Sequence, residues 1–236
     1  MRVAALSDIH GNLPALEAVL ADVEREGVDE IIVGGDSVSG PWPVEVLEHL
    51  EAVAARVVRG NADRLVLERD KGRLGAWCAD RLGSERLAAV ARWPLTLELD
   101  VLGLGRVLVC HSTPGSDDPI YTRITPDDEV LDLLGPMSSD VVVCGHTHMQ
   151  YDRRLSSGLR LVNPGSVGLP YEGRPGAFWA LLGPDVEFRD TPYDVESTAA
   201  AIRALDAPME EELIELLVHA VDSDTATAEF EQLRGA

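Results

Sequence analysis

Short apolar runs, each followed within three residues by Asp, Asn or His, constrain the fold of this chain more than any other feature. The runs are continuous rather than alternating in apolar character, which is typical of strands covered on both faces. They lie at Val3–Leu6, Glu30–Val33, Arg56–Val58, Val107–Cys110 and Val141–Cys144. Segments with helical periodicity lie between them, so the sequence predicts a layered α/β fold.

The clearest helical patterns fall between the early runs. Leu13–Glu26 places its apolar side chains on one face and has Asn12 available as a cap, and Pro43–Ala54 repeats the pattern. A later helix is expected after Thr125, which would cap it, with Pro126 in its first turn.

The second half of the chain has a different sequence pattern, with turn residues between short strand-like segments. Turn residues at 156–158 and at 183–185 predict hairpins, the second between Ala177–Leu182 and Val186–Asp190. We therefore expect a second sheet with more antiparallel character.

Two helical additions complete a single domain that spans 1–236. The segment 64–92 is interpreted as a helical insertion, broken at Gly72, Gly75 and Gly83. The segment 195–236 is interpreted as an acidic helical extension in which Asp206-Ala207-Pro208 separates two helices.

The charge balance excludes some classes of partner. The chain has 41 acidic and 20 basic residues, a formal charge of −21, so we expect neither long nucleic acids nor anionic membranes as partners. Its three cysteines are too few for a disulfide framework, and Cys110 and Cys144 are expected in the core. With no signal-like start and no apolar run near the roughly 20 residues of a membrane span, a cytoplasmic location is expected.

Asp, Asn and His residues follow closely after each of the five apolar runs. Because the carboxyl ends of strands in an open α/β sheet converge on the ligand crevice, these side chains should meet at one edge. They are Asp8, His10, Asp36, Asn61, His111, His146 and His148. A lone histidine after a strand is usually only a satisfied polar residue, so the joint occurrence carries the prediction. His49 and His219 fall in helical segments and receive no role.

This set of side chains predicts a metal site. Imidazole, carboxylate and amide ligands suit manganese, and also iron, zinc, nickel or cobalt, better than calcium or magnesium. Seven candidate ligands are too many for one ion, but two ions about 3.5–4 Å apart and bridged by a carboxylate would use them all. Two dications also exceed the charge of Asp8 and Asp36, and the positive surplus would attract a phosphate group.

The motifs Asp8-Ile9-His10, Gly35-Asp36, Gly60-Asn61, His111 and Gly145-His146-Thr147-His148 resemble those of the calcineurin-like metallophosphoesterases. The segment 163–168 is similar to one in the small bacterial phosphodiesterase branch. The resemblance implies a four-layered α/β/β/α sandwich with two central mixed sheets. It also implies hydrolysis of a phosphoester by a metal-bridging hydroxide. One metal would be held by Asp8, His10 and His148, the other by Asn61, His111 and His146, and Asp36 would bridge them.

The sequence departs from the family pattern at two positions. The family's third motif commonly has a histidine that assists the leaving group, and Ala62 stands there instead. Because general acid help is typically worth about 10²–10⁴-fold, this departure favours diesters over monoesters. Ser112 follows His111 where the family often has glycine, and we interpret it as filling space.

Three residues are candidates for contact with substrate: Asn61, Asn12 and, more weakly, Arg123. The helix cap already explains Asn12, and a pairing of Arg123 with Asp117 or Asp118 would explain that arginine.

The function predicted is metal-dependent hydrolysis of a small phosphoester, with a phosphodiester favoured. A nucleotide or protein phosphatase acting on monoesters, or a non-catalytic metal-binding scaffold like the retromer subunit of this fold, is the alternative. A nuclease fits the acidic composition poorly. Homo-oligomerisation is left open.

Overall fold

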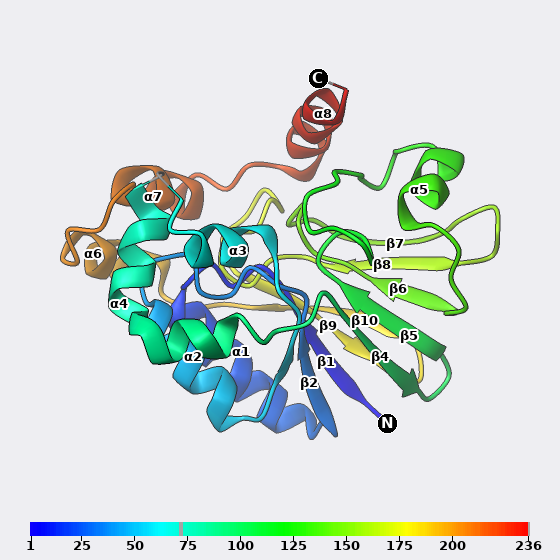
Figure 1. Ribbon diagram of the computed structural model, residues 1–236, viewed down its shortest axis with the longest axis horizontal. Coiled ribbons are helices and arrows are strands. Elements are labelled where there is room, and N and C mark those ends of the chain that lie inside the picture. Colours follow the sequence, from blue (N-terminus) through cyan, green and yellow to red (C-terminus); the bar gives the residue numbers. More distant parts are fainter. Residues whose placement is uncertain (71–72, 236) are drawn as a thin grey trace.

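The computed structural model of the chain describes residues 1–70 and 73–235. Two sheets of five strands lie face to face, with helices on their outer sides (Figure 1). This arrangement confirms the expected four-layered α/β/β/α sandwich with two mixed sheets.

The first sheet is built around the N-terminal strand and has the order β10-β9-β1-β2-β3. Its strands are β1 (Val3–Leu6), β2 (Glu30–Val33), β3 (Arg56–Val57), β9 (Ala177–Leu182) and β10 (Val186–Thr191). Strands β1, β2 and β3 run parallel, whereas β9 pairs antiparallel with both β1 and β10. Every residue of β1 is buried, as a central strand covered on both faces requires.

The second sheet has the order β4-β5-β6-β8-β7. Its strands are β4 (Thr96–Val101), β5 (Gly105–Cys110), β6 (Val141–Val143), β7 (Gln150–Arg154) and β8 (Arg160–Pro164). The three central strands are parallel, and the edge strands β4 and β7 pair antiparallel with their neighbours. The parallel strands of both sheets end at the same side of the molecule, where the loops of the centre described below meet (Figure 1).

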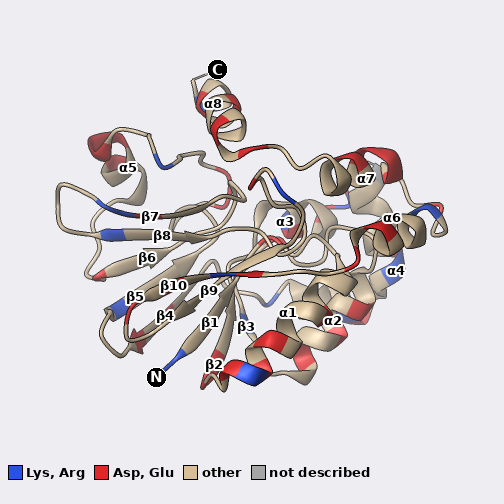
Figure 2. Cartoon of the chain, turned by 180° about the vertical axis from the view of Figure 1, so that it is seen from behind, with Lys and Arg blue, Asp and Glu red and all other residues tan. Residues whose placement is uncertain are grey.

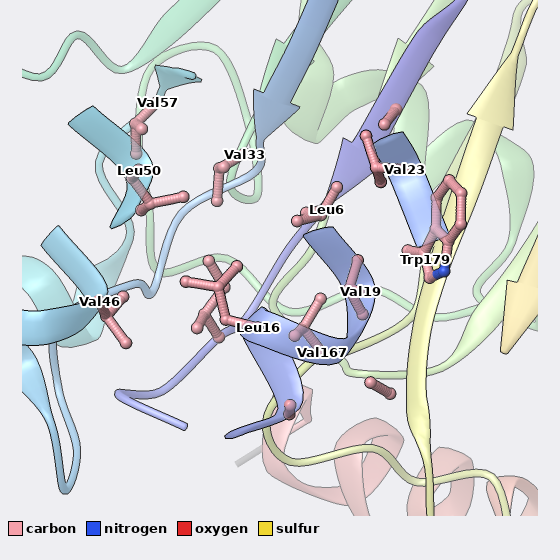
Figure 3. Packing of buried hydrophobic residues seen from close by; sticks show 14 of the residues in the cluster. Leu6, Leu16, Val19, Val23, Val33, Val46, Leu50, Val57, Val167 and Trp179 are labelled. Atoms are coloured by element: carbon pink, nitrogen blue, oxygen red, sulfur yellow. The ribbon is translucent and has the colours of Figure 1, made fainter. Parts of the chain in front are cut away.

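The hydrophobic core consists of layers. Between the sheets, Val3 and Ala5 pack in one buried cluster with Val107 and Val109. On the outer face of the first sheet, α1 (Leu13–Glu26) and α2 (Pro43–Ala52) bury their apolar stripes. Figure 3 shows α1 lying against that sheet, with its apolar side chains directed at the strands. The outer face of the second sheet is covered by α5 (Asp127–Leu134).

The remaining helices are α3 (Asn61–Leu67), α4 (Arg73–Val90), α6 (Val195–Arg203), α7 (Glu210–Val218) and α8 (Ser223–Arg234). Acidic residues are prominent on α1, α2, α5, α7 and α8 (Figure 2). In the two described ranges, no helix has the length and apolar character needed to cross a membrane. The three cysteines are unpaired and buried, as expected for Cys110 and Cys144.

The expectation that the second half of the chain forms the second sheet was wrong. The second sheet already begins with β4, and β9 and β10 return to the first sheet. The two predicted hairpin turns are present, between β7 and β8 and between β9 and β10. The turns were predictable from local residues, but the sheet that each hairpin joins depends on pairing with strands far away in the sequence.

Some predicted helix details also need correction. The hydroxyl of Thr125 does not cap α5, because it accepts from Thr122 N and donates to Glu231 of α8. Gly83 interrupts α4 as expected, whereas Gly75 lies inside it without a break. Gly72 lies outside the described residues. The C-terminal segment forms three helices rather than two, although Asp206-Ala207-Pro208 does separate the first pair.

Candidate metal centre

Five loops that follow β1, β2, β3, β5 and β6 bring all seven predicted ligands together. In the first group, His148 Nε2 lies 3.3 Å from Asp8 Oδ1 and 3.1 Å from His10 Nε2. His10 Nε2 is in turn 3.7 Å from Asp36 Oδ2. The ligand atoms of Asp8, His10 and His148 all lie within 4.8 Å of one another, which is the spacing of a shared ion.

The second group lies on the other side of Asp36. His111 Nε2 is 3.5 Å from Asp36 Oδ2 and 2.8 Å from Asn61 Oδ1. The ring of His146 packs edge-on against that of His111, with 4.9 Å between the centroids. Because Asp36 Oδ2 is close to His10 and to His111, it stands where a bridging ligand would.

Strained backbone is concentrated in this centre. Asp8, His10, Asp36, His146 and His148 all adopt positive φ values, between 47° and 71°. Such a conformation costs a non-glycine residue on the order of 1–3 kcal/mol and persists only where the surroundings enforce it. Loop hydrogen bonds enforce it here, among them Asp8 N to Gly35 O at 3.0 Å and His10 N to Asp36 O at 2.8 Å.

Two glycines let the ligand loops approach each other. A Cβ atom on Gly60 would lie 2.1 Å from Oδ1 of Asp36, and one on Gly145 would lie 2.5 Å from Oδ2 of Asp8. Any side chain at these positions would displace a carboxylate of the centre.

Asp63 fixes the loop after β2. Its carboxylate accepts backbone N–H bonds from Ser37, Val38 and Gly60 at 2.8, 3.0 and 3.1 Å. Burial, and then the negative charge of Asp36, raise the pKa of Asp63 to about 7. The role of Asp63 was not predicted from the sequence, although the residue lies in the Gly60-Asn61-Ala62-Asp63 motif.

The segment 163–168, noted for its family resemblance, ties two ligand loops together. Asn163 Nδ2 donates to Gly145 O at 2.7 Å, next to His146. Ser166 Oγ donates to Asp8 O at 2.7 Å. The segment therefore holds the backbone of the centre and contributes no ligand group of its own.

The hydrogen bonds of Nδ1 indicate which nitrogen of His111 and His148 carries the proton. Nδ1 of His111 is 2.8 Å from Gly34 O, and Nδ1 of His148 is 2.7 Å from Leu169 O. A carbonyl oxygen only accepts, so Nδ1 carries the proton and, in the neutral ring, Nε2 keeps its lone pair. The lone pair of His111 then faces Asn61 Oδ1, acceptor against acceptor. A cation beside these atoms would satisfy both, so the residues fit a divalent transition metal.

The electrostatics of the centre agree with such a donor set. Burial alone would raise the pKa of Asp8, but the surrounding imidazoles, His148 first, hold it well below its usual range. Burial lowers the pKa of His146 to about 4, and the neighbouring His111 adds to the shift. Burial would lower the pKa of His111 as well, but Asp36 and Asp8 raise it above its usual value. Asp8 therefore remains ionised although it is fully buried.

Two of the three substrate candidates are engaged in other contacts. Asn12 accepts from Ala15 N as the cap of α1, and its amide nitrogen donates to Gly168 O and to Tyr193 Oη, both at 3.1 Å. Arg123 contacts Asp224 and, at 3.2 Å, Ser223 Oγ, both on α8. The prediction that Arg123 pairs with Asp117 or Asp118 was wrong.

The partner of those two aspartates is Arg64, which sequence reasoning had not singled out. Its guanidinium lies 3.1 Å from Asp117 Oδ1 and 2.6 Å from Asp118 Oδ1. The hydroxyl of Ser112 donates to Pro119 O, which agrees with a structural role. No local sequence signal identifies the ion pairs of Arg64, because 53 residues separate it from Asp117.

A family model of the calcineurin-like phosphoesterase superfamily domain matches residues 1–182 of the chain. That stretch contains β1 to β9 and every side chain of the centre. The chain belongs to the calcineurin-like phosphoesterase superfamily. The predicted family is thus confirmed, and with it a phosphoesterase with groups suited to divalent metals.

Two curated proteins are similar to this chain over most of their length. The chain is 28% identical over 222 residues to the uncharacterized protein MJ0912 of Methanocaldococcus jannaschii, covering 82% of this chain and 88% of that protein. It is 28% identical over 200 residues to the phosphodiesterase YfcE of Escherichia coli. That match covers 77% of this chain and 87% of YfcE.

Solved structures of other proteins share the fold. The crystal structure of a metallophosphoesterase from Sphaerobacter thermophilus has a TM-score of 0.76 at 29% identity and covers 94% of this chain and 99% of that one. The hypothetical protein PH1004 from Pyrococcus horikoshii OT3 has a TM-score of 0.82 at 24% identity over the same shares, which supports the fold alone.

Proposed function

We propose that this phosphoesterase hydrolyses a small phosphodiester with two divalent transition-metal ions, for which manganese is our first choice. The observation that carries the proposal is the convergence of the seven predicted ligand residues, with Asp36 at the centre of the other six. One ion would be held by Asp8, His10 and His148, the other by Asn61, His111 and His146, and both by Asp36.

When bound, such a metal pair supplies a water nucleophile of lowered pKa and neutralises charge on the phosphoryl group. The side chains of the centre orient that chemistry. The hydrogen bonds of His111 and His148 to backbone carbonyls fix which nitrogen faces inward. The amide nitrogen of Asn61 has no hydrogen-bond partner within the described ranges, so it is available to donate to a phosphoryl oxygen.

The surroundings of Ala62 favour a diester. Its backbone N–H donates to Asp36 Oδ1 at 2.8 Å, but its methyl side chain has no proton to give a leaving group. The nearby guanidinium of Arg64 is occupied by Asp117 and Asp118, so it is not free to neutralise the second negative charge of a monoester. A diester carries one charge and needs less compensation. The related YfcE bears the name phosphodiesterase, which points the same way.

Two other readings have weaker support. A non-catalytic scaffold would not need the complete ligand set or the strained backbone that holds it. A nuclease acting on long nucleic acids would meet a chain of net charge −21, with acidic residues on α1, α2, α5, α7 and α8 (Figure 2).

The test compares bis(p-nitrophenyl) phosphate with p-nitrophenyl phosphate, using metal-stripped protein reloaded with manganese, iron, zinc, nickel or cobalt. We expect turnover of the diester to exceed that of the monoester and to require added metal. Asp36→Asn should remove most of it, whereas His49→Gln, which changes a histidine outside the centre, should not. Full turnover by the metal-stripped protein would refute the proposal, and a higher rate on the monoester would reverse the preference.

A further inference from the structure

The C-terminal helix α8 lies apart from the helices that precede it. In Figure 1 it stands at the top of the molecule, between α7 and α5, and the short segment 219–222 leads to it from α7. The helix buries only Ala226 and Thr227, and none of its residues belongs to a large apolar cluster in the parts that the structure describes. Packing of a hydrophobic face therefore does not explain why α8 docks here.

Polar contacts hold the helix against the loop that follows β5. Thr122 Oγ1 donates to Glu231 Oε1 at 2.6 Å, and Thr125 donates to the same oxygen. Near the end of α8, Arg234 bonds to Glu129 of α5 and to Glu231. At the start of α8, Arg123 contacts Ser223 and Asp224. The helix is thus secured at both ends and faces the centre with the side between them.

That side touches the His148 loop at one point and the loop after β8 at another. The ring centroids of Phe230 and Tyr171 lie 6.1 Å apart, and the two ring planes are inclined by 48°. The hydroxyl of Thr227 lies 3.3 Å from the sulfur of Met149, the residue directly after His148.

Tyr171 in turn contacts His148 through its ring and its backbone. The two rings are stacked, with 5.0 Å between centroids and 17° between planes. Tyr171 N donates to His148 O at 3.2 Å, and Leu169 O accepts from His148 Nδ1. The imidazole is therefore oriented by a hydrogen bond at its edge and by an aromatic ring on its face.

We propose that Tyr171 is a positioning residue for His148, and that α8 keeps Tyr171 in place through Phe230. The C-terminal helix would then be part of the metal centre, although it supplies no ligand. The inference rests on the proposed function, because it takes His148 as a ligand. Outer contacts that orient a ligand typically change metal affinity by about 10–100-fold.

The test measures manganese affinity and stoichiometry by titration, and the absorption spectrum of the cobalt-loaded protein, none of which depends on turnover. We expect Tyr171→Ala and Phe230→Ala to weaken one of two metal sites by about 10–100-fold and leave the other near its original affinity. Tyr171→Phe keeps the ring and should restore the affinity. Leu233→Ala, on the same helix but with its side chain 62% exposed, is the matched control and should not change it.

Wild-type affinity in Tyr171→Ala would overturn the positioning role, and wild-type affinity in Phe230→Ala would overturn the part given to α8. If Tyr171→Ala does not fold, the other two variants still test the proposal. It requires that Phe230→Ala changes the cobalt spectrum and that Tyr171→Phe leaves the spectrum unchanged. A wild-type protein that binds no pair of metals would instead refute the proposed function, which separates the two failures.

Discussion

Nε2 of His111 faces Oδ1 of Asn61 at 2.8 Å, while Nδ1 of the same ring is bonded to Gly34 O. Two acceptors this close repel each other unless a positive charge lies beside both. With this orientation of the Asn61 amide, a cation or an extra proton on His111 between the two atoms makes the contact favourable.

The first prediction concerns metal removal. A ligand present at 100 times its dissociation constant stabilises the folded state by about 2.7 kcal/mol, so chelation should lower the melting temperature clearly. Thermal unfolding with and without EDTA measures this, and His111→Ala should show a smaller response. An unchanged melting temperature on chelation would contradict the arrangement of acceptors around a shared cation.

The second prediction concerns the close approach at Gly60. A Cβ atom there would lie 2.1 Å from Asp36 Oδ1, so Gly60→Ala should displace this carboxylate. A displacement of about 1 Å at a reacting centre can lower turnover by about 10²-fold. Gly115→Ala is the control, because an added Cβ there meets nothing within 4 Å. Equal diester turnover in the two variants would show that Asp36 tolerates the shift.

The third prediction concerns the missing proton donor. Ala62→His would place an imidazole beside Asp36, and assistance to the leaving group should speed substrates with poor leaving groups by up to about 10²–10⁴-fold. Rates on diesters and monoesters with leaving groups of graded pKa measure this change in preference. Ala62→Gln, similar in size but unable to act as an acid, should leave the preference unaltered. If the histidine and glutamine variants behave alike, the argument from position 62 fails.

The fourth prediction concerns the docking of α8 at acid pH. Burial would raise the pKa of Glu231, but hydrogen bonds from Thr122, Thr125 and Arg234 bring it below its ordinary value of 4.5. Because the folded-state pKa is depressed, the stabilisation is present above pH 4.5 and is lost as pH falls through the lower, folded-state value. The protection factors of the amides in 223–234, which correct for the slower intrinsic exchange in acid, should therefore fall below that pH. Glu231→Gln should exchange faster already at pH 7 and respond less to acid, and protection in it equal to wild type would disprove the role of this carboxylate.

The parts of the fold that were predictable from sequence are those with local causes. The limits of β1, β2 and α1 agree with their apolar patterns because each element buries one continuous run or one stripe. Strand β4 was not identified, although Thr96–Val101 alternates as an edge strand should. Helix α8 was not distinguished within the C-terminal extension, because side-chain hydrogen bonds rather than an apolar stripe fix its position.

In the candidate metal centre, too, the features with local causes were predictable and those that depend on distant contacts were not. Its seven predicted ligands lie together because strand ends determine where they meet, and their role as ligands stays a prediction. The residues that orient them were not predicted, because their contacts join distant parts of the chain. Tyr171 stacks on His148 only after the loop beyond β8 folds back, and Arg64 reaches Asp117 across 53 residues.

The left-handed backbone of Asp8, His10, Asp36, His146 and His148 implies a trade-off between durability and activity. Glycine adopts such angles without the steric cost that a side chain brings. Replacing any of these residues by glycine should therefore relieve strain while it deletes a ligand. A screen of this protein for heat resistance alone, in the absence of metal, would be expected to enrich variants that survive heating and no longer turn over substrate.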